Sequence, residues 1–131
     1  AENPKGFKGY SDACWGLTAS YSVKGYNAHM PSNDHGVITP TAALSSYPYT
    51  PEESSKALKH FYFNLGDSIW GKYGFYDAFS EGENWYPRRY LAIDQCTITP
   101  MIENYRTNLL WNLFMSHPDV QKGIQKIQSI K

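Results

Sequence analysis

The stretch T-P-E-E-S-S-K-A-L-K-H-F-Y-F-N-L, residues 50–65, decides the fold class. Pro51 is typical of the first position of a helix, where its missing N–H would have no partner in any case. Thr50 and Glu53 have the spacing of a capping box, in which two side chains bond backbone N–H groups at a helix start. Apolar residues then recur on one helical stripe: Ala57, Leu58, Phe61 and Leu65. We predict an amphipathic helix that ends or is interrupted at Gly66.

The same proline signal occurs three more times, at Thr39-Pro40, Thr99-Pro100 and His117-Pro118. It predicts further helices that begin near residues 40, 100 and 118. The helix over roughly 100–115 is nearly apolar on every side, so we expect it to be buried, with Trp111 in the core. The helix over roughly 118–130 has one apolar stripe among Lys and Gln, and we expect it at the surface.

Two long segments lack helical periodicity. Residues 1–37 are rich in Gly, Tyr, Ser and Asn, and we expect loops there with one short helix around Asp12–Leu17. Between the second and third helices lies an aromatic stretch. If residues 73–79 are extended, alternation places four side chains on one side: Tyr73, Phe75, Asp77 and Phe79. We predict a mainly α chain with one domain over 1–131, loop-rich to residue 37 and helical over 38–131 with a central aromatic loop.

The composition narrows the class of partner. The 12 basic and 12 acidic residues cancel, which gives no electrostatic argument for nucleic acid or an anionic membrane as a partner. No apolar run approaches the roughly 18 residues needed to span a bilayer. Aromatic residues make up 16% of the chain, more than four short helices can cover. We therefore expect either one sector of a larger helical assembly or an aromatic-lined binding surface.

No metal or cofactor is predicted. Cys14 and Cys96 lie far apart in sequence, and both a disulfide and two free thiols remain open. Neither a C-x-x-C pair nor a His-rich pair suggests a zinc site. The sequence also has no Gly-rich phosphate loop and no nucleophile elbow. The N-terminal A-E-N-P-K-G-F-K-G-Y lacks the apolar segment of a signal peptide.

Five motifs together resemble a known family. In chain order they are C-W-G-L-T-A-S from residue 14, H-G-V-I-T-P-T-A-A-L-S-S-Y-P-Y-T-P-E-E-S from 35, W-G-K-Y-G-F-Y-D-A-F from 70, Y-L-A-I-D-Q from 90 and M-I-E-N-Y-R from 101. Their order is similar to that in the bacterial glucoamylase-like glycoside hydrolases, a group that includes enzymes acting on β-1,2-glucans. One departure is Cys96, where the family usually has Gly, and a larger side chain is expected to alter the loop that holds Asp94.

The resemblance implies a glycoside hydrolase with an (α/α)6 toroid of paired helices. A full toroid of about twelve helices needs several hundred residues at roughly ten to fourteen residues a helix. The chain would then be the C-terminal sector, and the upstream portion of the same domain, or self-association, would cover its apolar faces. The resemblance also implies an oligo- or polysaccharide partner and a periplasmic or extracellular location.

Three acids are candidates for the chemistry, because glycoside hydrolysis commonly uses two carboxyl groups. Asp94 ends the apolar run Y-L-A-I, and we expect it in a loop as a general base or a substrate-orienting group. Asp77 lies among aromatic residues that would desolvate it, raise its pKa and favour an acid role. Glu103 stands one helical turn before Arg106, which favours a structural ion pair. A structural role is the alternative for Asp94 and Asp77 as well.

Further residues suit carbohydrate binding. Aromatic side chains stack on the apolar faces of sugar rings, although aromatics more often belong to a core. The aromatic candidates are Trp15, Tyr26, Trp70, Tyr73 and Trp85, and we expect Trp15 and Trp85 to be the most exposed. The polar candidates are His29, Asp34 and Gln95.

Two hypotheses follow for the function. The first is part of a glycosidase acting on a β-glucan or a related glucose polymer, with its partner acid upstream of this chain. The second is a non-catalytic carbohydrate-binding or self-associating fragment of such an enzyme.

Overall fold

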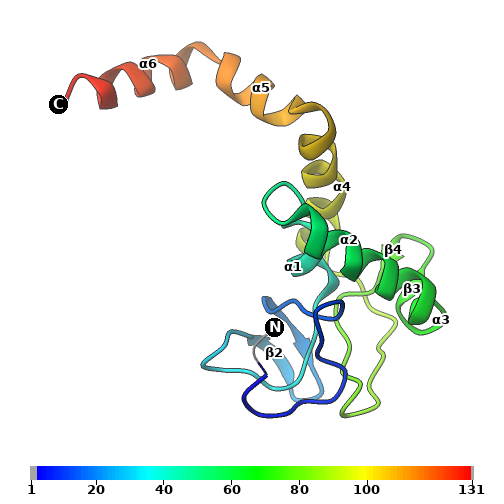
Figure 1. The fold of residues 1–131 in the computed structure, drawn as a ribbon. Coiled ribbons are helices and arrows are strands. Elements are labelled where there is room, and N and C mark those ends of the chain that lie inside the picture. The colour runs from blue at the N-terminus through cyan, green and yellow to red at the C-terminus, as the bar shows by residue number, and fades with distance from the viewer. Residues whose placement is uncertain (1–2, 131) are drawn as a thin grey trace.

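A computed structural model describes residues 3–130 (Figure 1). The chain is rich in helices and has two small antiparallel sheets, each of two strands. The strands are β1 (Ala19–Ser22), β2 (Gly25–Ala28), β3 (Trp70–Gly71) and β4 (Gly74–Phe75). The helices are α1 (Pro40–Leu44), α2 (Pro51–Lys59), the π-helix η1 (His60–Asn64), α3 (Gly66–Ile69), α4 (Ala92–Thr107), α5 (Leu109–Ser116) and α6 (Pro118–Gln128). None of the helices in this range is long and apolar enough to cross a membrane.

The predicted helix starts at Pro40, Pro51 and Pro118 are confirmed. The prediction of a capping box was wrong. The Thr50 hydroxyl donates to the Ser46 carbonyl at 3.2 Å and does not bond an N–H of the first helical turn. The predicted interruption at Gly66 is confirmed, since α2 passes into η1 and a new short helix begins at Gly66.

The helix predicted to begin at Pro100 instead begins eight residues earlier, at Ala92, and carries Pro100 in its interior. Proline removes one i→i−4 hydrogen bond, here the one to the Cys96 carbonyl, and the helix tolerates that loss. At Asn108 the backbone is left-handed, with φ of 57°, and this residue separates α4 from α5. The predicted single helix over 100–115 is therefore two helices.

The N-terminal region holds a β-hairpin rather than the short helix predicted around residues 12–17. Strands β1 and β2 pair antiparallel, with Ser22 opposite Gly25, so the loop between them has two residues. Gly25 has φ of 107°, a conformation that glycine adopts without a steric cost. The hairpin was missed because its strands are made of small and polar residues that show little alternation.

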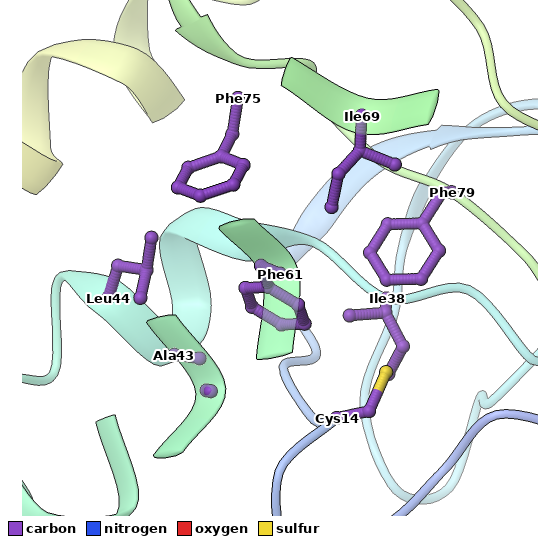
Figure 2. Packing of buried hydrophobic residues seen from close by; sticks show 9 residues of the cluster. Cys14, Ile38, Ala43, Leu44, Phe61, Ile69, Phe75 and Phe79 are labelled. Carbon is purple, nitrogen blue, oxygen red and sulfur yellow. The ribbon is translucent and has the colours of Figure 1, made fainter. Parts of the chain in front are cut away.

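The core lies where α1, α2 and η1 pack on the 69–79 segment (Figure 2). Phe61 is central, with Phe75 and Phe79 edge-on to it at ring-centre distances of 6.1 and 5.8 Å. Of the four side chains that alternation placed on one side, Phe75, Asp77 and Phe79 are buried and Tyr73 is 68% exposed. Ala78 is buried as well, so burial does not alternate strictly along this segment. The apolar stripe predicted over residues 57–65 is confirmed. Ala57 and Phe61 belong to this core, and Leu58 and Leu65 pack against it.

Helices α5 and α6 extend away from the core as an arm (Figure 1). Neither helix has a buried residue. For α6 this confirms the predicted surface position. For α5 the prediction of burial was wrong, and Trp111 is 39% exposed rather than in the core. The helix is apolar on most sides, as the sequence indicates, but within residues 3–130 nothing covers Leu113 and Phe114, which are 60% and 64% exposed.

Candidate active site

Asp94 lies in the first turn of α4, not in the loop predicted from the sequence. Leu91 precedes the helix in an extended conformation, and its carbonyl accepts the N–H groups of Asp94 and Gln95 at 3.1 and 3.0 Å. The Asp94 residue is only 7% exposed. Cys96 is exposed, so its side chain points away from the packed side of the helix.

Two threonines fix this first turn to α1. The Thr41 hydroxyl donates to the Asp94 carbonyl at 2.7 Å, and the Thr97 hydroxyl reaches the same oxygen at 3.0 Å. The two hydroxyls also lie 2.9 Å apart, and Ser45 bonds Thr97 at 2.9 Å. Thr41 is buried, so the network holds the backbone that carries Asp94 in one position. No local sequence pattern marks this pairing, because the two segments are more than fifty residues apart.

Asp77 is 1% exposed and joins three segments of the chain. Its Oδ2 accepts the Tyr21 N–H of β1 at 2.9 Å. Its own N–H donates to the Arg89 carbonyl at 2.8 Å. The Arg89 guanidinium lies over the Tyr21 ring at 4.1 Å, a cation–π contact. The hairpin and the 85–90 segment thus hold Asp77 from two sides.

The carboxyl groups of Asp77 and Asp94 are close enough to share a hydrogen bond. Asp77 Oδ1 and Asp94 Oδ2 are buried and accept no N–H or O–H from other described residues. Burial raises the pKa of Asp94 to about 7, and the hydrogen bond and negative charge of Asp77 add to that rise. A helix N-terminus favours the ionised form, so desolvation and like charge outweigh the helix dipole here.

Glu103 lies apart from this pair, near the other end of α4. Arg106 Nη1 is 3.2 Å from Glu103 Oε2, which confirms the predicted ion pair. The Thr107 hydroxyl donates to Glu103 Oε1 at 2.9 Å. The pair is exposed rather than buried, so it is worth little to stability.

The polar binding candidates are not gathered at one place. Gln95, beside Asp94, donates from Nε2 to the Phe75 carbonyl and so ties α4 to β4. The carboxylate of Asp34 accepts the Tyr10 hydroxyl at 2.7 Å and the Gly36 N–H at 2.9 Å. These contacts engage one Asp34 oxygen in holding its own loop.

His29 is buried, and neither of its ring nitrogens has a hydrogen-bond partner among the described residues. Burial lowers the pKa of His29, and His35, whose ring is 5.7 Å away, lowers it further. Asp34 and Asp77 act in the opposite direction on the same ring. His29 is therefore a neutral imidazole within the electrostatic reach of Asp77.

Among the aromatic candidates the predicted order of exposure was wrong. Trp15 packs against the core and Trp85 is half-buried, whereas Trp70, Tyr26 and Tyr73 are 44%, 55% and 68% exposed. Gly and Asn neighbours suggested exposure for Trp15 and Trp85, but tertiary packing covers both. Tyr73 packs edge-on against the ring of Tyr90 at 5.4 Å.

Two hollows occur on the described surface. One, of about 390 Å³, lies beside the hairpin and is lined by Phe7, Ser22, Val23, Lys24, Asn27, Asp34, His35, Val37 and Glu83. The other, of about 470 Å³, is lined by Tyr62, Gly66, Asp67 and Trp70. Neither of these two hollows is lined by Asp77 or Asp94.

The two cysteines are free thiols, with Cys14 buried and Cys96 exposed. Burial raises the pKa of the Cys14 thiol to about 12, and the charge of Glu81 adds to that rise. Cys14, His60 and Glu81 form a group that could hold a metal ion, although no sequence motif connects them.

The sequence matches one protein family over most of its length. A family profile described as "Glycoamylase: Putative glucoamylase" matches residues 1–118. The chain belongs to this Glycoamylase family, which confirms the resemblance seen in the motifs.

Solved and characterised relatives are similar over almost the whole chain. An exo β-1,2-glucooligosaccharide sophorohydrolase (non-reducing end) of Parabacteroides distasonis is 58% identical over 99% of this chain, which covers 18% of that protein. An endo-β-1,2-glucanase structure from Chitinophaga pinensis, in complex with sophorotriose and glucose, is 65% identical with a TM-score of 0.92; the match covers 95% of this chain and 30% of that one. A β-1,2-glucanase structure from Parabacteroides distasonis is 57% identical with a TM-score of 0.93 and covers 97% and 18%. The chain thus spans less than a third of the length of these relatives.

Proposed function

We propose that this chain is the C-terminal sector of an (α/α)6 glycoside hydrolase that acts on β-1,2-glucan or its oligosaccharides. The observation that carries the proposal is the burial of Asp94 beside Asp77: burial first, and then the hydrogen bond and negative charge of Asp77, raise the pKa of Asp94 to about 7. A carboxyl group that holds its proton near neutral pH can protonate the leaving oxygen of a glycosidic bond. The similarity to β-1,2-glucan hydrolases supplies the substrate class.

The pair does not by itself make a complete glycosidase centre. Retaining enzymes place their two carboxyl groups about 5–5.5 Å apart and inverting enzymes about 6.5–9.5 Å. The hydrogen bond between Asp77 and Asp94 is a direct contact, whereas both of these arrangements hold the two carboxyl groups apart. Asp77 and Asp94 therefore hold a proton together, with burial as the largest cause of the raised pKa of Asp94 and the neighbouring Asp77 as a further cause. The second functional acid belongs to the upstream portion of the domain.

The exposed apolar face of α5 supports a missing portion of the domain. Leu109, Leu110, Leu113, Phe114 and Met115 are all more than 40% exposed. Surfaces of this kind mark interaction sites. In a toroid of paired helices, a neighbouring helix from upstream would cover this face and close the cleft above Asp94.

A β-glucan substrate and the similarity to glucan hydrolases fit a periplasmic or extracellular location.

A graft tests the proposal. Residues 1–131 would replace the matching segment of the Parabacteroides distasonis sophorohydrolase, and release of sophorose from β-1,2-glucooligosaccharides would be measured. The graft should cleave the oligosaccharides, whereas the isolated chain should not, because it lacks the second acid. A folded graft without activity, or full hydrolysis by the isolated chain, would contradict the proposal.

Self-association is the second candidate, and the exposed face of α5 is the observation that favours it. Light scattering of the isolated chain over a range of concentrations measures it directly. Leu113→Glu should restore a monomer if α5 forms the contact. Ile130→Glu, at an exposed residue just after α6, is the matched control. A monomer at every concentration would count against self-association and leave the upstream portion as the cover of α5.

A further inference from the structure

Three side chains that can bind a metal meet at the edge of the core, away from the acid pair. Cys14 comes from the N-terminal loop, His60 is the first residue of η1, and Glu81 follows the buried Ser80. One ligand atom of each lies within 4.8 Å of the other two. The three residues are far apart in sequence, so only the tertiary fold brings them together.

The immediate surroundings leave these groups without other partners. Cys14 is fully buried, and His60 Nε2 is buried without a hydrogen-bond partner among residues 3–130. A buried polar nitrogen without a partner costs free energy. A cation bound between the three ligand atoms would remove that cost and offset the negative charge of Glu81.

The backbone of each ligand is held in place. The backbone N–H and C=O groups of Ser11 and Cys14 bond each other at 3.0 and 3.3 Å, which forms a tight turn. The Glu81 carbonyl accepts the Asn84 N–H at 3.3 Å, within a loop closed by the Ser80–Trp85 bridge. Rigid backbones of this kind favour metal binding, because little order has to be gained when the ion binds.

Gly9 makes room for the third ligand. A Cβ atom at this position would lie 2.7 Å from the Glu81 carboxyl carbon and from its Oε1. Gly9 also has φ of 91°, which side chains rarely allow. The loop therefore passes close to the Glu81 carboxylate, and a side chain at residue 9 would collide with it.

We propose that Cys14, His60 and Glu81 bind one divalent transition-metal ion, with zinc as the best fit. Zinc takes sulfur, nitrogen and oxygen ligands in a tetrahedron, and three protein ligands leave a fourth position for water. A thiolate and an imidazole disfavour calcium and magnesium, which prefer oxygen ligands. The ion would join the N-terminal loop, η1 and the 81–84 loop, and so would brace the segment that carries Asp77.

Metal titration of the purified, untagged chain tests the proposal. After treatment with a chelator and dialysis, zinc chloride should bind at one equivalent per chain in a calorimetric titration. Cobalt(II) in place of zinc should show a thiolate-to-cobalt absorption in the near ultraviolet. His60→Gln and Cys14→Ser should each weaken zinc binding by at least about a hundredfold, the upper end for the loss of a residue that supports a metal site.

Two exposed residues of the same types give matched controls, Cys96→Ser and His117→Gln, which should leave binding unchanged. Cys14 lies in the core, so Glu81→Gln replaces Cys14→Ser if circular dichroism shows that the latter does not fold. The absence of saturable binding to the folded chain would overturn the proposal. Equal binding by wild type and His60→Gln, or loss of binding in Cys96→Ser, would overturn it as well.

Discussion

The two ends of helix α4 hold a carboxyl group in opposite ways. In its first turn, Asp94 is buried against Asp77, and no salt bridge to either occurs within the described range. Near its last turn, Glu103 pairs with Arg106 at the surface. Charge interactions are far stronger in a low-dielectric interior than in water. The same helix therefore carries one acid whose ionisation matters to the fold and one whose ionisation matters little.

Removing the charge of Asp77 gives the largest expected effect. In the graft on the Parabacteroides distasonis sophorohydrolase, Asp77→Asn should lower kcat by at least about a hundredfold, the usual size of an acid–base contribution. Asp67→Asn is the matched control, because Asp67 is exposed and lies on α3. If both variants keep the parent rate, the acid pair has no part in the reaction.

The pH dependence of stability comes next. The folded-state pKa of Asp94 is raised from 3.8 to about 7, so the folded state binds this proton more tightly than the unfolded state does. Its stabilising contribution is full below pH 3.8 and is lost as the pH rises through about 7. We expect a loss on the order of a few kcal/mol across that window, at about 1.4 kcal/mol for each unit of pKa.

Urea unfolding of wild type and Asp94→Asn at a series of pH values isolates this contribution. The difference in unfolding free energy between the two proteins should change in favour of Asp94→Asn as the pH rises from 4 to 8, as the raised pKa requires. A difference that is constant over this range would show that Asp94 titrates normally.

A smaller effect concerns the pKa of Asp94 itself. Asp77→Asn removes the negative charge that contributes to the raised value, but burial, the largest cause, remains. Carboxyl-carbon NMR titration should therefore find the pKa of Asp94 below about 7 and still above 3.8. A pKa left at about 7 would assign the whole shift to burial and break the proposed coupling.

The smallest effect belongs to the other end of α4. Glu103→Gln should lower the unfolding free energy by less than about 0.5 kcal/mol, as is usual for exposed helical ion pairs. Added salt should reduce the difference further. A loss several times larger, measured by the same urea unfolding, would place Glu103 with the buried acids.

Local signals predicted the helical part of the fold well. Proline at a first helical position located α1, α2 and α6, because that preference depends on the backbone alone. Pro100 predicted the wrong start for α4. The polar contacts of Thr41 and Thr97 with the Asp94 carbonyl hold the start of this helix earlier in the chain. The burial of α5 could not be judged, since it depends on what lies beside the helix.

The candidate site was predicted only as separate residues. Asp77 and Asp94 were both named from their apolar neighbours, yet their contact depends on the packing of β4 and α4 and has no local signal. The same holds for the Tyr21 N–H that bonds Asp77 and for the grouping of Cys14 with His60. The predicted Glu103–Arg106 pair is correct because both residues lie on one helix at a fixed spacing.

One direct measurement compares the two ends of α4 within one enzyme. Asp94→Asn and Glu103→Gln would be made in the same graft, and the rates of β-1,2-glucooligosaccharide cleavage measured side by side, with folding checked by circular dichroism. If Asp94 holds the proton used in catalysis, Asp94→Asn should be slower by at least about a hundredfold, while Glu103→Gln stays within about twofold of the parent. Equal rates for the two folded variants would contradict the account.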